Sequence, residues 1–85
     1  MAILRLGGVL TATGHKSPSS IYDRIKAGLF PKPVPIGARA VGWPDYEVEQ
    51  ISAAVIAGAD DDTLRALVEN LHAERARKLA LLLAA

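Results

Sequence analysis

Apolar and polar residues follow one another with several different periods along this chain, and each period predicts one structural element. Residues 3–6 alternate weakly, which predicts a short strand or an extended lead-in. Residues 8–13 predict a short helix, and Gly14 can end it because glycine readily takes the left-handed backbone conformation. The glycines at the start of this helix are poor helix formers, so we expect tertiary packing to hold it.

The next segment carries clearer helix signals. Ser17 is a preferred N-cap residue, and Pro18 suits the first helical position because its fixed φ matches the helix. Ile21 and Ile25 are four residues apart and mark a buried stripe, and Gly28 predicts the end of the helix. The side chains expected to point away from the core are Ser19, Tyr22, Asp23 and Lys26, with Ser20 and Arg24 on the flanks.

A proline-rich stretch follows this helix. Prolines at alternate positions from 31 to 35 keep the chain extended and exclude a helix. Residues 34–36 and 40–43 flank a short turn that begins with Gly37, which predicts a β-hairpin with a positive φ at that glycine. Pro35 has no N–H, so its strand must either lie at an edge of the sheet or leave that position unpaired.

The C-terminal half predicts two further helices. Asp45 and Glu47 follow Pro44 and place acidic residues in the first turn of a helix, where the helix dipole favours them. Gly58 predicts the end of this helix. The residues expected on its apolar face are Val48, Ile51, Val55 and Ile56.

A last helix is predicted from the acidic residues 60–62 to about Leu83. Glu74 and Lys78 have the spacing of an i,i+4 ion pair, and they interrupt the leucine seam of this helix. The interruption argues against a long coiled coil. Two interpretations stay open: the helix packs on its own small core, or it serves as a dimerisation or partner-binding helix.

Together these elements predict one small domain, since a chain of 85 residues buries a single modest core. The expected fold is mainly α with a small β-hairpin wing, that is, a winged helix-turn-helix followed by a C-terminal helix. We assign residues 1–58 to the winged helix-turn-helix and residues 59–85 to the C-terminal helix. Trp43 is expected in the core, because it closes the hairpin beside the following helix.

The net charge of +1 conceals a strong asymmetry. Residues 1–43 hold six basic side chains against Asp23 alone, a net charge of +5, whereas residues 44–85 hold four basic against eight acidic side chains, a net charge of −4. A half that is almost purely cationic is where a polyanion would bind. Arg39 is the leading candidate, because an arginine on a protruding loop can enter a narrow minor groove or clamp the DNA backbone.

Composition excludes several other classes of protein. The chain has no cysteine, and His15 and His72 lie far apart, so no disulfide, metal site or thiol chemistry is expected. No nucleophile–base pair and no glycine-rich phosphate loop is recognisable, so we expect neither a cofactor nor an enzymatic activity. No apolar run approaches the ~20 residues of a membrane span and the N-terminus lacks a signal-peptide pattern, so the cytoplasm is the expected compartment.

Three motifs between Gly14 and the acidic helix after Pro44 occur in a characteristic order. They are Ser19-Ser20-Ile21-Tyr22, Phe30-Pro31-Lys32-Pro33-Val34 and Arg39-Ala40-Val41-Gly42-Trp43. The chain from Leu4 to Gly58 thereby resembles the AlpA-type prophage regulatory proteins, which are small winged-helix DNA-binding proteins related to phage excisionases and MerR-type regulators. The resemblance implies a transcriptional regulator or a recombination directionality factor of a mobile element.

We therefore predict sequence-specific binding to double-stranded DNA, with the helix over residues 17–27 in the major groove and Arg39 on the backbone or in the minor groove. Asp23 can accept a hydrogen bond from cytosine N4 or pair with Arg24 or Lys26. The candidate DNA-binding residues are Lys16, Ser17, Ser19, Ser20, Tyr22, Asp23, Arg24, Lys26, Lys32 and Arg39.

The leucine-rich tail adds an expected homodimer or cooperative oligomer on DNA. Two alternative functions stay open beside the regulator. One is an excisionase-like factor that bends DNA for a recombinase. The other is a protein-interaction adaptor that acts through the leucine-rich tail.

Overall fold

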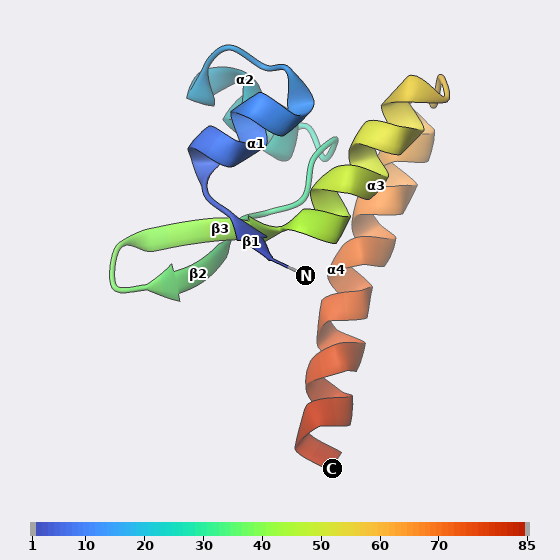
Figure 1. Cartoon of the computed structure of the whole chain (residues 1–85). Coiled ribbons are helices and arrows are strands. Elements are labelled where there is room, and N and C mark those ends of the chain that lie inside the picture. The colour runs from blue at the N-terminus through green and yellow to red at the C-terminus, as the bar shows by residue number, and fades with distance from the viewer. Residues whose placement is uncertain (1, 85) are drawn as a thin grey trace.

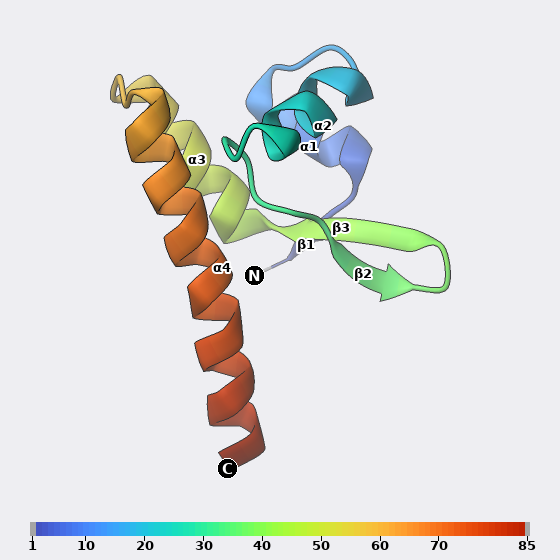
Figure 2. The same cartoon turned by 180° about the vertical axis from the view of Figure 1, so that it is seen from behind.

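Four helices and a three-stranded antiparallel sheet make up the computed structural model, which describes residues 2–84 (Figures 1 and 2). This confirms the predicted fold, mainly α with a small β wing. In chain order the elements are β1 (Ile3–Leu4), α1 (Leu6–Thr13), α2 (Pro18–Lys26), β2 (Val34–Gly37), β3 (Ala40–Pro44), α3 (Asp45–Ile56) and α4 (Asp61–Ala84).

The first two helices end where glycine permits a left-handed backbone. α1 begins at Leu6, two residues earlier than expected, and ends at Gly14, whose φ is 77°. Gly28 follows α2 with a φ of 80°. There the N–H of Leu29 donates to the carbonyl of Arg24 at 2.8 Å, the long hydrogen bond of a Schellman motif. This turn directs Leu29 and Phe30 back into the core, where both are buried.

The start of α2 differs from the prediction in one respect. Ser17 has the extended backbone of an N-cap, and Pro18 occupies the first helical position. The Ser17 side chain, however, makes no capping hydrogen bond. Its hydroxyl lies 3.4 Å from the Ser20 hydroxyl instead. The boundary of α2 therefore rests on the backbone of Pro18 and not on a side-chain cap.

The sheet has the order β1-β3-β2, so β3 is its central strand and Pro35 lies on an edge strand, as expected. An irregularity between Pro35 and Gly37 interrupts the pairing of β2 with β3. The prediction of a positive φ at Gly37 was wrong: within residues 2–84 positive φ is confined to Gly14, Gly28 and Gly58. Ala38 and Arg39 form the tip of the hairpin.

Trp43 is the centre of the core and is fully buried, as predicted. The Phe30 ring packs against it with a centroid distance of 6.3 Å. Its indole Nε1 donates a hydrogen bond to the carbonyl of Pro31 at 2.8 Å, which satisfies the buried N–H. Every helix contributes to the buried cluster around it, through Val9, Ile21, Val48, Ile51, Val68 and Leu71.

α3 and α4 pack side by side, and the C-terminal part of α4 extends beyond the rest of the molecule (Figures 1 and 2). Val55 and Ile56 were expected on the buried face of α3, but they are 51% and 86% exposed. Both line an open cavity whose other walls include Thr13 of α1 and Arg24 of α2, so the first two helices do not close over the last turn of α3.

The first turn of α4 is capped as expected. The Asp60 carboxylate accepts a hydrogen bond from the Thr63 N–H at 2.8 Å. The hydrogen bonds from Thr63 hold the pKa of the Asp60 carboxyl below its usual value. This carboxylate therefore stays charged at neutral pH and keeps the cap.

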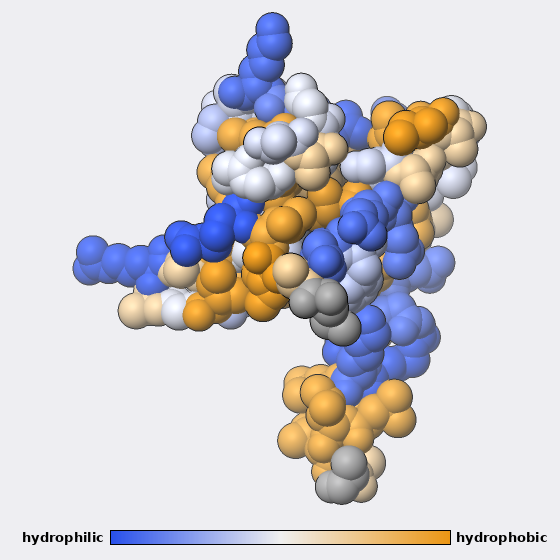
Figure 3. Space-filling model, in the orientation of Figure 1, coloured by the Kyte–Doolittle hydropathy of each residue, from blue (hydrophilic) through white to orange (hydrophobic). Residues whose placement is uncertain are grey.

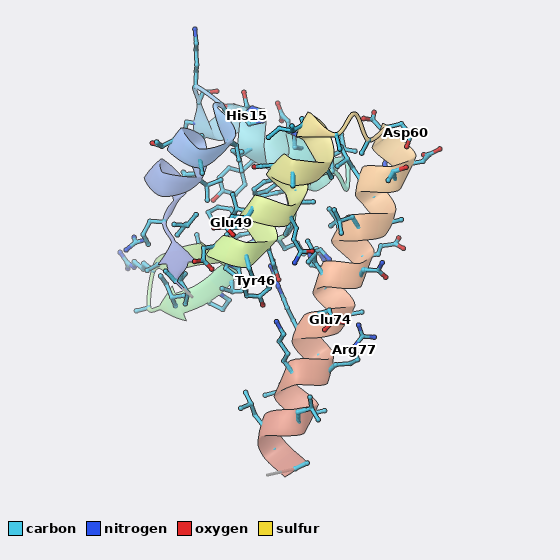
Figure 4. The ribbon with its side chains drawn as sticks, turned by 45° about the vertical axis from the view of Figure 1, so that its right-hand side comes forward. His15, Tyr46, Glu49, Asp60, Glu74 and Arg77 are labelled. Carbon is cyan, nitrogen blue, oxygen red and sulfur yellow. The ribbon has the colours of Figure 1, made fainter. Side chains whose placement is uncertain are left out.

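The expected ion pair between Glu74 and Lys78 does not form. Glu74 pairs with Arg77, and Figure 4 shows these two side chains next to each other on α4. Lys78 donates instead to the Tyr46 hydroxyl at 3.0 Å and lies over the Tyr46 ring. This hydrogen bond raises the pKa of Lys78.

None of the helices in residues 2–84 combines the length and apolarity that crossing a bilayer requires.

Only the first part of α4 belongs to the core. Leu64, Val68 and Leu71 are buried, whereas Leu79 and Leu81–Leu83 are more than half exposed. The interpretation that the helix packs on its own core is therefore confirmed for the beginning of α4 only. Its beginning packs on the core of its own chain, and its end leaves apolar side chains in solvent.

A test of this architecture is the substitution Gly42→Ala. A Cβ at Gly42 would overlap the Ile3 side chain of β1 and lie 2.9 Å from the Leu4 carbonyl oxygen. We expect the free energy of unfolding, measured by urea denaturation, to fall by about 1–3 kcal/mol, the usual cost of overpacking. The matched control is Gly37→Ala, whose new Cβ would meet nothing closer than 3.8 Å. Equal stability of the two variants would contradict the close approach of β1.

Candidate nucleic-acid interface

The exposed face of α2 carries the side chains expected there. Ser19, Tyr22, Asp23 and Lys26 are exposed, and the flanking Ser20 and Arg24 are half-buried. This orientation follows from the burial of Ile21 on the opposite side of the helix.

Tyr22 combines packing with exposure. Its ring lies edge-on to Trp43, with a centroid distance of 6.4 Å, and the side chain is 44% exposed. Contact with the buried indole orients the ring, while the exposed part stays on the same face as Lys26.

The hairpin of β2 and β3 stands out from the body of the molecule (Figure 1). Arg39 lies in the turn at its tip and is exposed, and Lys32 is exposed in the segment that leads into β2. Figure 3 shows hydrophilic side chains at the far end of the hairpin and above the α1–α2 pair. Lys16, in the turn between α1 and α2, is also exposed.

The basic side chains of this region have no acidic partner within residues 2–84. The ion pairs of the described chain are Arg65 with Asp62, Arg75 with Glu47 and Arg77 with Glu74, all in the C-terminal half. The suggested pairing of Asp23 with Arg24 or Lys26 is therefore not found. Five cations in α2, in the segments on either side of it and in the hairpin turn have no carboxylate partner within residues 2–84: Lys16, Arg24, Lys26, Lys32 and Arg39.

Three side chains of α4 make hydrogen bonds to the backbone of the segment between α2 and β2. The Arg65 Nε donates to the carbonyl of Ala27 at the end of α2, at 3.0 Å. The Lys32 N–H donates to the His72 Nε2 at 3.1 Å, and the Arg75 Nη2 donates to the Lys32 carbonyl at 2.8 Å. Both backbone polar groups of Lys32 are thus bound by α4.

A buried ion pair holds α4 in this position. The Glu47 side chain is 1% exposed and the Arg75 side chain 23%. The Arg75 Nε donates to one carboxylate oxygen of Glu47 at 2.9 Å, and its Nη2 donates to the other. This bidentate arrangement suits the planar guanidinium and satisfies a carboxylate that water does not reach.

Burial favours the neutral form of the imidazole of His72, which lies beside this pair. Burial holds the pKa of His72 below its usual value, and the charge of Arg75 adds to this effect while Glu47 opposes it. A neutral imidazole can leave Nε2 unprotonated, which is what accepting the Lys32 N–H requires.

The family model described as prophage CP4-57 regulatory protein (AlpA) matches residues 2–53, more than half of the chain. The chain belongs to this family. The match confirms the resemblance seen in the sequence motifs of α2, the proline-rich segment and the hairpin. No curated protein and no solved structure matches the chain.

In this AlpA-family protein the match ends within α3, so α4 lies outside it. From the sequence, Glu47 was interpreted as an acidic residue of a first helical turn and Arg75 as a basic residue late in the last helix. The ion pair between them was not predicted. A signal was present, because Glu47 lies four residues before the buried Ile51 and Arg75 four residues after the buried Leu71. That spacing places each charge on a buried stripe.

The ion pair can be tested through Arg75→Met, which keeps much of the side-chain volume and leaves Glu47 buried without a partner. We expect a loss of about 3 kcal/mol in the free energy of unfolding, measured by denaturant titration. The matched control is Arg77→Met, because the pair of Arg77 with Glu74 is exposed and its loss costs under about 1 kcal/mol. A similar small loss in both variants would mean that the pair does not hold α4.

Proposed function

We propose that this AlpA-family protein is a sequence-specific DNA-binding regulator of a phage or mobile element, built as a winged helix-turn-helix. α2 enters the major groove, and the hairpin acts as a wing that carries Arg39 to the backbone or the minor groove. The observation that supports this most is the set of exposed cations without acidic partners on α2 and the hairpin.

The shape and chemistry of α2 suit a recognition helix. An α-helix fits the width of the major groove, and the exposed face of α2 offers hydroxyls near its start and Lys26 at its end. Ser19 lies in the first turn, where a short side chain leaves the backbone N–H groups open to a phosphate. This end of α2 therefore positions the helix on the DNA.

The hairpin supplies the second contact. Arg39 is exposed in the two-residue turn of a hairpin that stands out from the body of the molecule, so it can reach DNA beyond the groove that α2 occupies (Figure 1). A guanidinium is attracted to the negative potential of a narrow minor groove and also binds phosphate well.

Binding should be strongly dependent on salt. If the five unpaired cations contact phosphates, the logarithm of the binding constant falls with the logarithm of salt concentration with a slope near −4 to −5. The measurement uses labelled duplex from upstream of the protein's own gene against a scrambled duplex. Preference for the first duplex supports a sequence-specific regulator. Binding to neither duplex at low salt would contradict the proposal and favour a protein partner.

Mutations can distinguish side chains that contact the DNA backbone from side chains that select the base sequence. We expect Arg39→Ala and Lys26→Ala each to weaken binding to all duplexes and to reduce the salt slope by about 1. Substitution of Ser19 or Ser20 should instead change which duplex is preferred. Arg77→Ala removes an equal charge from the far side of α4 and is the matched control. Unchanged slopes in Arg39→Ala and Lys26→Ala would remove the proposed contacts.

We also propose that two copies pair through the end of α4. Leu79, Leu81, Leu82 and Leu83 are 56–77% exposed and point to several sides of the helix, a pattern typical of buried helices. We expect a second copy of the chain on this surface, because one α2 contacts only a few base pairs. Two paired copies on two half-sites would make twice as many base contacts as one copy.

Pairing is tested by sedimentation velocity over a concentration series. We expect a concentration-dependent dimer that Leu82→Glu converts to a monomer, because a charge would be buried in the apolar contact. Glu69→Gln, an exposed change near the beginning of α4, is the control and should leave the dimer intact. A wild-type protein that stays monomeric at all concentrations would contradict the pairing.

A further inference from the structure

The segment between α2 and the hairpin is anchored by side chains and not by a regular element. It runs from Ala27 to Pro33 and leads from the end of α2 into β2, the first strand of the hairpin. Trp43 binds the carbonyl of Pro31, at 2.8 Å. All other side-chain hydrogen bonds to its backbone within residues 2–84 come from α4.

The α4 contacts lie on one face of a single helix. Arg65, His72 and Arg75 are seven and three residues apart, which brings them to the same side of α4 over about 15 Å of its length. Arg65 binds the end of α2, whereas His72 and Arg75 bind Lys32 just before β2. A rigid helix thus connects the two ends of the segment.

We propose that His72 and Arg75 are positioning residues that set the place of the hairpin relative to α2, and through it the distance between the two DNA contacts. The inference rests on the proposed function for its consequence in DNA binding, but the positioning itself is a property of the free protein. It gives α4, which lies outside the family match, a defined role in the site.

Protonation of His72 breaks its hydrogen bond with the Lys32 N–H. The added proton turns the Nε2 acceptor into a donor that faces the Lys32 N–H. The charged groups around the imidazole are Arg75, Arg65 and Glu69 on α4, Glu47 on α3 and Lys32 itself. Since the pKa of His72 lies below its ordinary value of 6.5, the contact is intact above that pH and weakens as the pH falls below it.

The first experiment measures position without DNA. The chain contains no cysteine, so spin labels can be attached at Ala38→Cys on the hairpin tip and Ser19→Cys on α2. We expect a narrow distribution of label distances in the parent and a broad one in His72→Ala. His72→Gln should restore the narrow distribution, because the glutamine carbonyl can accept the Lys32 N–H. Asn70→Ala, an exposed change on α4, is the control.

A pH series replaces the alanine variant if that variant fails to fold. Lowering the pH of the parent from 7.5 to about 5 should broaden the distribution by protonating His72. His72→Gln should stay narrow over the same range. A distribution that is unchanged both in His72→Ala and at low pH overturns the proposal.

The second experiment is a double-mutant cycle on DNA. We expect Arg39→Ala to weaken binding about tenfold in the parent and less than about twofold in His72→Ala, because a displaced hairpin has already lost the Arg39 contact. His72→Ala should also reduce the salt slope by about 1 although it removes no charge at neutral pH, which simple destabilisation would not do. Additive effects with an unchanged slope overturn the proposal.

The two experiments separate the possible failures. Broadened distances in a protein that binds no duplex would refute DNA binding and leave the positioning role of α4 supported. DNA binding that requires Arg39, together with distances that His72→Ala does not change, would refute the positioning role and leave the proposed function supported.

Discussion

The buried ion pair of Glu47 with Arg75 is the interaction on which the arrangement of this protein depends. Removing a carboxylate from water costs several kcal/mol, and only a partner with matching geometry offsets this cost. Arg75 binds both carboxylate oxygens and donates a further hydrogen bond to Lys32. The pair therefore joins α3, α4 and the segment before β2, and it restricts α4 to one rotation about its axis.

The charge asymmetry of the sequence also appears in the ion pairs of residues 2–84. In the C-terminal half, arginines neutralise neighbouring acids through Arg65 with Asp62, Arg75 with Glu47 and Arg77 with Glu74. In the N-terminal half, the cations of α2 and the hairpin have no acidic partner among residues 2–84. The cations without an acidic partner are thus those on which the proposed contact with DNA depends.

Local features of the sequence were enough to predict most of the fold. Gly14 and Gly28 end their helices with positive φ, Pro18 begins α2, and Pro35 lies on an edge strand. Trp43 is buried where the hairpin meets the next helix. The exposed face of α2 followed from the spacing of Ile21 and Ile25. Each of these features depends on backbone restrictions or on helical periodicity within a few residues.

Other features could not be predicted because their partners are distant in the chain. Glu47 meets Arg75 from 28 residues away, and Gly42 is required by the approach of β1 and not by its own φ. Val55 and Ile56 follow the period of a buried stripe, yet they line an open cavity beside α1 and α2 and stay more than half exposed. Lys78 binds Tyr46 on another helix in preference to Glu74 on its own.

The sequence by itself determined where most of the helices end and which half of the chain is cationic. Glycine, proline and capping residues act through the conformational freedom of their own backbone, so distant segments hardly change their effect. Only the tertiary structure decided which charges are buried as a pair, which are left free and how the hairpin stands relative to α2. Those outcomes depend on which side of α4 packs against α3, and that choice is made by contacts between segments far apart in the sequence.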